Sequence, residues 1–241
     1  MKQGIKLITT GLYLLVFGIS YAPANFSDLD IQFHPVNHAT FVIQSKSATI
    51  YVDPVGDLKL FDQYPKPDII LITDIHRDHL NKELVDNIKH PGTLIICTKE
   101  VEKLLKAGEI LNNGERFNHQ DIVIEAIPAY NLSHDRLKFH PKGRGNGYII
   151  SISGKKIYIS GDTEDIPEMR ALRNIDYAFV CMNLPYTMTI DQAASAVLAF
   201  KPKIIFPYHY RGKKGFSDID KFKTTVEKTG HTQVKFLTWY K

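Results

Sequence analysis

The hydrophobic positions of this chain fall into short apolar runs that predict β-strands. Residues 31–43 and 48–52 alternate or run apolar and are joined across 45–47, which is a hairpin pattern. The uninterrupted apolar run at 69–73 is typical of a strand that is buried on both faces. Runs of the same kind predict further strands at 94–97, 121–129, 148–151, 156–160, 177–181, 203–207 and 234–237.

Stretches with helical spacing of apolar positions lie between these runs. They predict helices at 81–89, 98–106 and 217–228, and an Ala-rich helix that ends near residue 201. Two capping-box patterns, one at 165–168 and one at 189–192, predict the starts of a short helix and of the Ala-rich helix. Residues 130–146 have neither pattern and predict a long loop, which in a compact domain is usually functional or flexible.

Both halves of the chain show the same approximate order of elements, in which hairpins are followed by strand–helix units. This order predicts two α/β halves, each with a sheet covered by helices. Packing the two sheets face to face would give a four-layer αβ/βα sandwich. The length of 241 residues, with 44% hydrophobic and 23% charged positions, suits a globular protein with a large core.

Residues 1–24 have the layout of a secretory signal peptide, and we expect the folded domain to span residues 25–241. Lys2 and Lys6 form a basic start, residues 7–22 are largely apolar, and Ala22-Pro23-Ala24 supplies small residues for cleavage. The sequence therefore predicts an exported protein, periplasmic or secreted, without stable membrane insertion. An uncleaved N-terminal anchor is the alternative. Loss of the two lysines would lower the formal charge of +4, which is already too weak to indicate a nucleic-acid partner.

Polar residues that bind metals gather directly after the buried strand at 69–73. Asp74, His76, Asp78 and His79 lie within one short segment. Imidazoles and carboxylates crowded together in this way are costly to bury unless a cation lies among them. A polar loop that caps a strand is the simpler interpretation of this segment alone.

Two further strand ends change that balance in favour of a metal site. The strand at 156–160 leads to Gly161-Asp162-Thr163, and the strand at 203–207 leads to His209. Ligands of α/β sheets bind beyond the carboxyl ends of the strands, so these side chains are expected to meet at one edge. Gly161 would let the chain turn tightly and direct Asp162 inward.

These motifs resemble those of metallo-β-lactamase-fold hydrolases, in the branch that is similar to sugar-phosphate lactonases and phospholipase D-like enzymes. The usual first motif of the family is His-x-His-x-Asp-His, and residues 74–79 read Asp-Ile-His-Arg-Asp-His. The resemblance extends from residue 31 to residue 239 and implies the metallo-β-lactamase type of four-layer sandwich. It implies a metal-dependent hydrolase that binds one or two divalent ions, zinc first and manganese or iron as alternatives. The implied ligands are Asp74, His76, Asp78, His79, Asp162 and His209.

The resemblance also implies roles in catalysis. Asp162 would bridge the ions, and Asp78 would hold a metal and accept a hydrogen bond from the attacking water. A metal-activated water would then attack a small ester, lactone or phosphodiester. The substrate itself does not follow from the fold.

Two positions depart from the family pattern. Asp74 stands where a histidine is usual, and the third histidine, expected after the strand at 121–129, is replaced by Asn131 or by a loop histidine. Oxygen ligands favour harder cations, so a mixed or single-metal site is a hypothesis to test. The altered motif also leaves open a non-catalytic metal- or ligand-binding domain on the same fold, and a redox di-iron protein ranks after that.

Several other residues are candidates for supporting the metal or binding the substrate. Asp53 is expected to orient a ligand histidine, or else to serve only as a turn acid before a proline. His140 and Arg144, in the predicted loop, could bind an anionic group, or the loop could simply be solvated. The full set of these candidates is His38, Asp53, Asn131, His140, Arg144 and Tyr186. Cys97 and Cys181 lie in apolar runs and are predicted to be buried thiols, although export would permit a disulfide.

Overall fold

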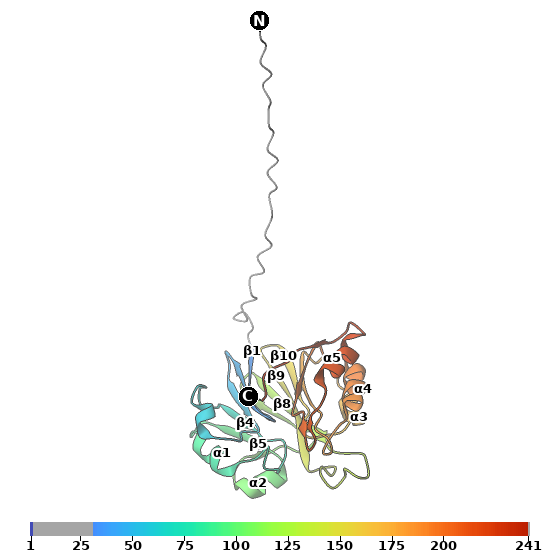
Figure 1. The fold of residues 1–241 in the computed structure, drawn as a ribbon. Helices are drawn as coiled ribbons and strands as arrows, with labels where there is room; N and C mark the ends of the chain where they lie inside the picture. The colour runs from blue at the N-terminus through green and yellow to red at the C-terminus, as the bar shows by residue number, and fades with distance from the viewer. Residues whose placement is uncertain (2–30, 241) are drawn as a thin grey trace.

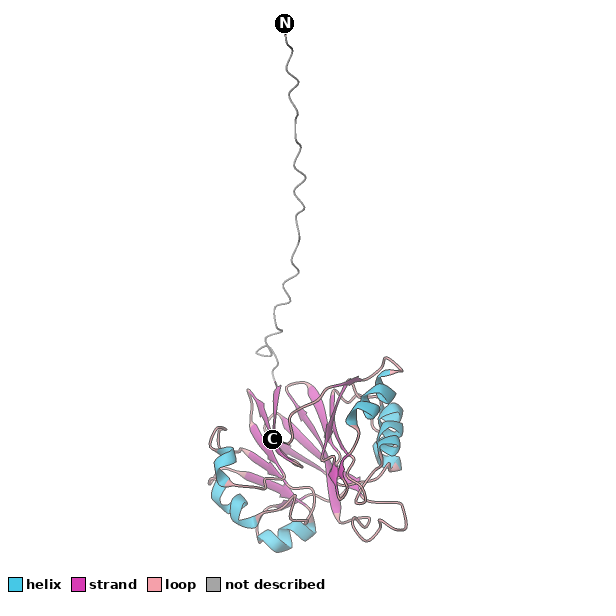
Figure 2. Ribbon diagram, viewed as in Figure 1, coloured by secondary structure: helices cyan, strands magenta, loops and turns pink. Residues whose placement is uncertain are grey.

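A computed structural model of the protein describes Met1 and residues 31–240. Figure 1 shows two sheets packed face to face, with α1 and α2 outside one sheet and α3, α4 and α5 outside the other. Figure 2 shows the same arrangement as strands in the middle and helices on both flanks. The predicted four-layer αβ/βα sandwich is therefore confirmed. The signal-peptide segment lies outside the described residues apart from Met1, and within 31–240 no helix is long and apolar enough to cross a bilayer.

The first sheet has six strands in sequence order, antiparallel from β1 to β3 and parallel from β3 to β6. The predicted single strand at 31–43 is wrong, because His38 adopts a left-handed backbone conformation (φ 56°) and turns the chain into a second strand. The strands of this sheet are β1 (Ile31–Asn37), β2 (Thr40–Ser45), β3 (Thr49–Val52), β4 (Ile69–Leu71), β5 (Leu94–Cys97) and β6 (Glu109–Ile110).

The second sheet has seven strands in the order β15-β12-β11-β10-β9-β8-β7. Its β9 begins at Gly145, earlier than expected, because residues 145–147 pair with the end of β8. The preceding loop therefore spans residues 130–144. The strands are β7 (Arg116–His119), β8 (Ile122–Ala129), β9 (Gly145–Ile152), β10 (Lys155–Ile159), β11 (Tyr177–Cys181), β12 (Ile204–Tyr208) and β15 (Gln233–Val234), and β13 (Arg211–Gly212) pairs with β14 (Gly215–Phe216) separately.

The helices begin where polar side chains cap them. Thr189 and Gln192 form the predicted capping box of α4, and Asn81, Thr98 and Asp218 cap α1, α2 and α5. The predicted capping box at 165–168 is wrong, because Ile166 is the N-cap residue of α3 and makes no side-chain cap. The helices are η2 (Leu58–Phe61), α1 (Lys82–Ile88), α2 (Lys99–Leu105), α3 (Pro167–Arg170), α4 (Ile190–Phe200) and α5 (Ile219–Glu227).

The two sheets are joined by packing and by hydrogen bonds near the carboxyl end of β4. The Tyr148 hydroxyl of β9 donates to the Ile72 carbonyl (2.9 Å), and the Asn146 amide donates to the Thr73 carbonyl (2.9 Å). Both cysteines are buried, as expected, and neither forms a disulfide. These contacts hold the end of β4 against the second sheet, which positions the residues that follow it.

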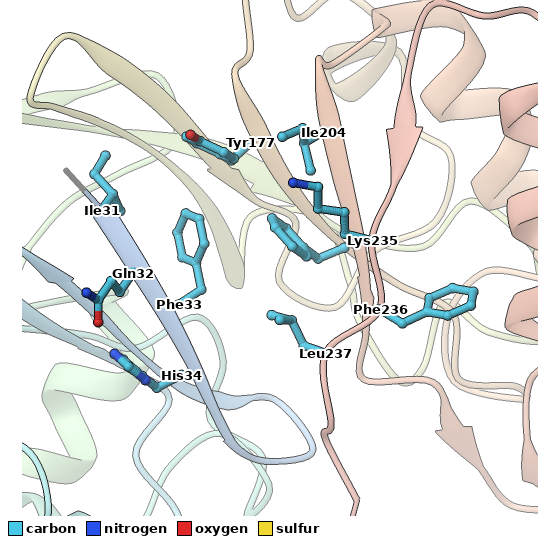
Figure 3. Close-up of a pocket in the computed structure, with 10 residues that line it drawn as sticks. Ile31, Gln32, Phe33, His34, Tyr177, Ile204, Lys235, Phe236 and Leu237 are labelled. Atoms are coloured by element: carbon cyan, nitrogen blue, oxygen red, sulfur yellow. The ribbon is translucent and has the colours of Figure 1, made fainter. Parts of the chain in front are cut away.

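A pocket of about 500 Å³ opens at the other edge of the sandwich. Figure 3 shows it between β1, which supplies Ile31 and Phe33, and the ends of β11 and β12, which supply Tyr177 and Ile204. These are the amino ends of parallel β11 and β12, so the pocket lies away from the edge that carries the metal-binding motifs. It includes none of the predicted site residues.

Candidate metal centre

The candidate metal ligands meet at the edge formed by the carboxyl ends of the parallel strands. This is the arrangement that the three strand-end motifs predicted. Their donor atoms form three groups, two of which share His209, and within each group the atoms all lie within 4.8 Å of one another. The groups are His79, Asp162 and His209; His38, Asp78 and His209; and Asp74, His76 and His140.

His79 is held in one orientation by Asp53, which follows β3. Its Nδ1 lies 2.8 Å from the Asp53 carboxylate, and both side chains are fully buried. The same carboxylate accepts hydrogen bonds from the amide and the hydroxyl of Thr73, each at 2.7 Å. The expected role of Asp53 in orienting a histidine therefore agrees with the geometry, since Nε2 of His79 is left to face the site.

Asp162 lies at the centre of the cluster. Its carboxylate oxygens are 3.4 Å from Nε2 of His79, 3.3 Å from Nε2 of His209 and 3.0 Å from Nε2 of His140. Burial alone would raise the pKa of Asp162, but His209, His79 and His140 outweigh it and hold the pKa well below the ordinary value. A buried carboxylate that stays ionised among three imidazoles is suited to bridge or bind a cation.

The charge states of His79 and His209 differ, although both face Asp162. Burial would lower the pKa of His79, but Asp162 and Asp53 raise it well above the usual value. Burial lowers the pKa of His209 to about 3, against the opposing effect of Asp162. His209 is therefore neutral, as a metal ligand must be, whereas His79 would release a proton on binding an ion.

Asp78 and His38 flank this group on its exposed side. Oδ2 of Asp78 lies 3.5 Å from Nε2 of His209 and 3.4 Å from Nε2 of His38. The other ring nitrogen of His38 lies 2.8 Å from the Tyr240 hydroxyl. The Asp78 side chain is 44% exposed, unlike the buried Asp162, so it can reach solvent in the pocket as well as an ion.

Several residues of the site have an unusual backbone conformation. His38, Asp53 and His209 all adopt left-handed conformations (φ 56°, 44° and 47°), which non-glycine residues rarely do outside functional or tightly packed positions. Gly161 also has a positive φ of 59°, and a Cβ there would lie 2.5 Å from the Asn146 carbonyl oxygen. The tight turn predicted from Gly161 is confirmed.

Asp74 and His76 form a second part of the site together with Arg144. The Arg144 guanidinium donates from Nη2 to Oδ2 of Asp74 and to Nε2 of His76, each at 3.2 Å. Burial, ahead of the opposing Asp74 charge, lowers the pKa of His76, which keeps its ring neutral and able to accept this bond. Arg144 therefore lies inside the cluster of candidate metal ligands rather than in a solvated loop.

His140 from the loop, and not Asn131, faces Asp162. The Asn131 side-chain amide donates to the carbonyls of Tyr186 (2.7 Å) and Arg136 (2.9 Å), so its nitrogen is directed away from a ligand role. Nδ1 of His140 lies 3.1 Å from the Tyr186 carbonyl and 3.2 Å from Nδ2 of Asn131, so the ring is held with Nε2 facing Asp162. Of the two alternatives for the missing histidine, the loop histidine fits the structure.

Two residues of the site were not singled out by the sequence. Glu164, fully buried, accepts from the amides of Leu132 and Ser133 (2.6 Å each) and from Arg136 (2.5 Å), and so anchors the loop that carries His140. Asn183 follows β11 and brings its amide to 3.5 Å from Nε2 of His209. The sequence could have indicated them only by their positions along the chain. Glu164 directly follows Gly161-Asp162-Thr163, and Asn183 follows a predicted strand.

A pocket of about 330 Å³ opens over the cluster. The donor set fits a divalent ion, because two imidazole nitrogens and a buried ionised carboxylate converge. Oδ1 of that carboxylate, Asp162, is buried without a hydrogen-bond partner among the described residues. The residues that line the pocket are His76, Asp78, Phe139, His140, Asp162, Asn183 and Tyr186.

Comparison with known proteins defines the class. Residues 31–209 match the family model of the beta-lactamase superfamily domain, the class that the four layers and the strand-end ligands already indicate. The chain is also 31% identical over 196 residues to a UPF0173 metal-dependent hydrolase of Thermoplasma volcanium, a match that covers 76% of this chain and 84% of that protein. The chain belongs to this UPF0173 family of metal-dependent hydrolases within the beta-lactamase superfamily.

Solved structures agree with this assignment. A candidate metal-dependent hydrolase of Parabacteroides distasonis is 40% identical and superposes with a TM-score of 0.79, covering 86% of this chain and 92% of that one. The metallo hydrolase Igni18 of Ignicoccus hospitalis is 25% identical, with a TM-score of 0.73 and coverage of 86% and 94%. The chain is thus a metal-dependent hydrolase, and the non-catalytic alternative is not supported.

Proposed function

We propose that this metal-dependent hydrolase acts on a small ester, lactone or phosphodiester at the pocket over Asp162. The observation that carries the proposal is the convergence of His79, Asp162 and His209 beneath a pocket of about 330 Å³. Such a volume is at the lower end of the range for small-molecule sites, which favours a compact substrate. The weak net charge favours a small molecule over a nucleic acid.

The metal in the proposal is zinc, with manganese or iron as alternatives. His79 and His209 supply nitrogen ligands and Asp162 an oxygen ligand, which is the mixed set that zinc accepts. Asp78 and His38 border the same group and are further candidates as ligands. A bound divalent ion supplies an acidified water and polarises the bond that is attacked.

The side chains of the protein perform the remaining tasks. Asp53 fixes the ring of His79 through the 2.8 Å contact with its Nδ1. Asp78, half-exposed, is placed to accept a hydrogen bond from the attacking water and so orient it toward the substrate. Phe139 and Tyr186 line the pocket with packed rings (centroids 5.1 Å apart) and would limit the size of the substrate.

A hydrolysis screen tests the proposal. The purified chain, stripped and then reloaded separately with zinc, manganese and iron, is assayed with bis-p-nitrophenyl phosphate, simple lactones and nitrocefin beside Asp162→Ala. We expect turnover of an ester, lactone or phosphodiester that the substitution abolishes. Turnover equal in the wild type and the variant, or absent with every metal, would overturn the proposal.

We also propose that the protein is exported after cleavage near Ala24. The support is the basic start, the apolar segment and the small residues of 1–24. Cell fractionation with N-terminal sequencing of the purified protein tests this. A mature N-terminus near residue 25 in the exported fraction is expected, and an intact Met1 on a membrane-bound protein would indicate an uncleaved anchor instead.

A further inference from the structure

Arg144 has contacts that a second metal ion would otherwise make. Asp74, His76 and His140 bring their donor atoms together within 4.8 Å. The Arg144 guanidinium lies 3.2 Å from both Oδ2 of Asp74 and Nε2 of His76. The cluster therefore already contains a positive charge that the chain itself supplies.

The donor atoms of Asp74 and His76 are engaged with the protein. Oδ1 of Asp74 accepts from the amides of Ile75 (2.5 Å) and His76 (3.3 Å), while Oδ2 accepts from Arg144. A guanidinium has no acceptor, so Nε2 of His76 must accept its hydrogen bond and the ring proton must be on Nδ1, which lies 3.6 Å from Oδ1 of Asp74. An ion could bind these atoms only by displacing the arginine.

The position of Arg144 is fixed from several directions. The Phe139 carbonyl also accepts from Nη2, whose two hydrogens are thus shared among three acceptors, and the Arg144 side chain is only 17% exposed. The next residue, Gly145, runs so close to Asp74 that a Cβ there would lie 3.2 Å from Oδ2. The adjoining strand, β9, is hydrogen-bonded to the segment that follows β4, through the Asn146 amide and the Thr73 carbonyl. These contacts hold Arg144 against Asp74 and leave it little room to swing away.

We propose that Arg144 takes the place of the second metal ion, so that the protein binds a single divalent ion at His79, Asp162 and His209. The inference rests on the proposed function, since it concerns the same site. A guanidinium stays charged at physiological pH, so a divalent ion a few ångströms away would be repelled as well as sterically excluded. Asp74, in the position of the usual histidine, is the partner that makes this possible, because a carboxylate binds a guanidinium where an imidazole would not.

Metal stoichiometry tests the inference without any need for a substrate. Three proteins are compared: the wild type, Arg144→Gln and the control Lys142→Gln. Each is dialysed against the same excess of zinc and freed of unbound ion. The bound zinc is then counted by inductively coupled plasma mass spectrometry, and its affinity is measured by isothermal titration calorimetry. Lys142 is in the same loop, but its side chain is 66% exposed and faces Glu168. We expect one ion in the wild type and in Lys142→Gln, and a second, weaker ion in Arg144→Gln.

Two results would overturn the inference: two ions of similar affinity in the wild type, or no additional ion in a folded Arg144→Gln. Arg144→Met, which retains the aliphatic volume of the side chain, replaces the glutamine variant if circular dichroism shows that the latter does not fold. Arg144→Lys should keep the single ion, because the charge is retained. Failure of the proposed function is a separate result, since it is absence of turnover whatever the number of ions bound.

Discussion

The two halves of the metal centre share Asp162 but differ in what surrounds it. On one side, His79 and His209 direct their Nε2 atoms, 3.1 Å apart, toward the carboxylate, 3.4 and 3.3 Å from its oxygens. On the other side, Asp74 and His76 use their donor atoms to bind Arg144. The same edge of the sheets thus carries a candidate ion site on one side and a salt bridge on the other.

The comparison shows how one substitution at the end of a strand changes a binding site. An imidazole at position 74 would offer a neutral nitrogen to an ion and would not attract a guanidinium. A carboxylate there is paired with Arg144, which comes from a loop far along the chain. The His79 half, by contrast, is supported by the buried Asp53, which leaves Nε2 of His79 directed toward Asp162.

The largest effect is expected at the residue that both halves share. Asp162→Asn removes the buried charge on which three imidazoles converge, so metal affinity and hydrolysis should both fall by more than about 100-fold. Asp165→Asn is a control on the same segment, since its carboxylate pairs with the exposed Arg170 (2.7 Å). Near-normal metal content in Asp162→Asn would contradict the central role of Asp162 in both halves of the site.

A second prediction tests the support of the His79 half. Asp53→Asn weakens the partner that orients the ring of His79, and metal affinity should fall by about 10- to 100-fold. Asp62→Asn, on the surface beside η2, should leave the affinity unchanged. Titration with a chromophoric chelator measures both. An equal loss in the two variants would show that Asp53 has no special role.

A third prediction concerns the loop that supplies His140 and Arg144. Glu164→Gln removes the charge that binds two amides and Arg136, and the free energy of unfolding should fall by about 1–3 kcal/mol. Asp135→Asn breaks only an exposed contact with the same arginine (3.8 Å) and should cost less than about 1 kcal/mol. Chemical denaturation of the metal-free proteins measures the difference, and similar losses would contradict this account of the loop.

The smallest effect is the pH dependence of the same anchor. Burial would raise the pKa of Glu164, but hydrogen bonds from Ser133 and Leu132 and the Arg136 charge lower it below the ordinary value. A carboxylate with a lowered folded-state pKa stabilises the protein above its unfolded pKa, about 4.3, and this stabilisation is lost as the pH falls through the folded-state pKa. The difference in Tm between wild type and Glu164→Gln should therefore shrink on acidification from pH 6 toward pH 3. A constant difference would show that the charge does not matter.

The sequence predicted the layers of the fold because the strands are apolar runs that leave little choice. Residues 69–73 and 178–181 are buried without interruption, and the shortness of these continuous apolar runs identifies them as strands. The left-handed turn at His38 and the early start of β9 depend on tertiary pairing instead. The sequence around neither feature predicts it. The left-handed turn is made by a histidine rather than a glycine, and Gly145 pairs with Ala129, 16 residues away.

The site was predictable where its residues follow strands and not where they come from a loop. The motif at 74–79, Asp162 and His209 are ordered by parallel strands whose carboxyl ends must meet. His140 and Arg144 are placed by the carbonyls of residues 186 and 139, in a loop that Glu164 anchors, and no spacing rule relates these residues to them. The choice between Asn131 and a loop histidine therefore needed the structure.

Anomalous diffraction from crystals grown with zinc tests the central claim most directly. We predict one strong peak within bonding distance of His79, Asp162 and His209, and an Arg144 that still contacts Asp74. Two peaks of similar height, with Arg144 displaced from Asp74, would contradict the single-ion site. A peak elsewhere, with none beside Asp162, would contradict the assignment of the metal centre itself.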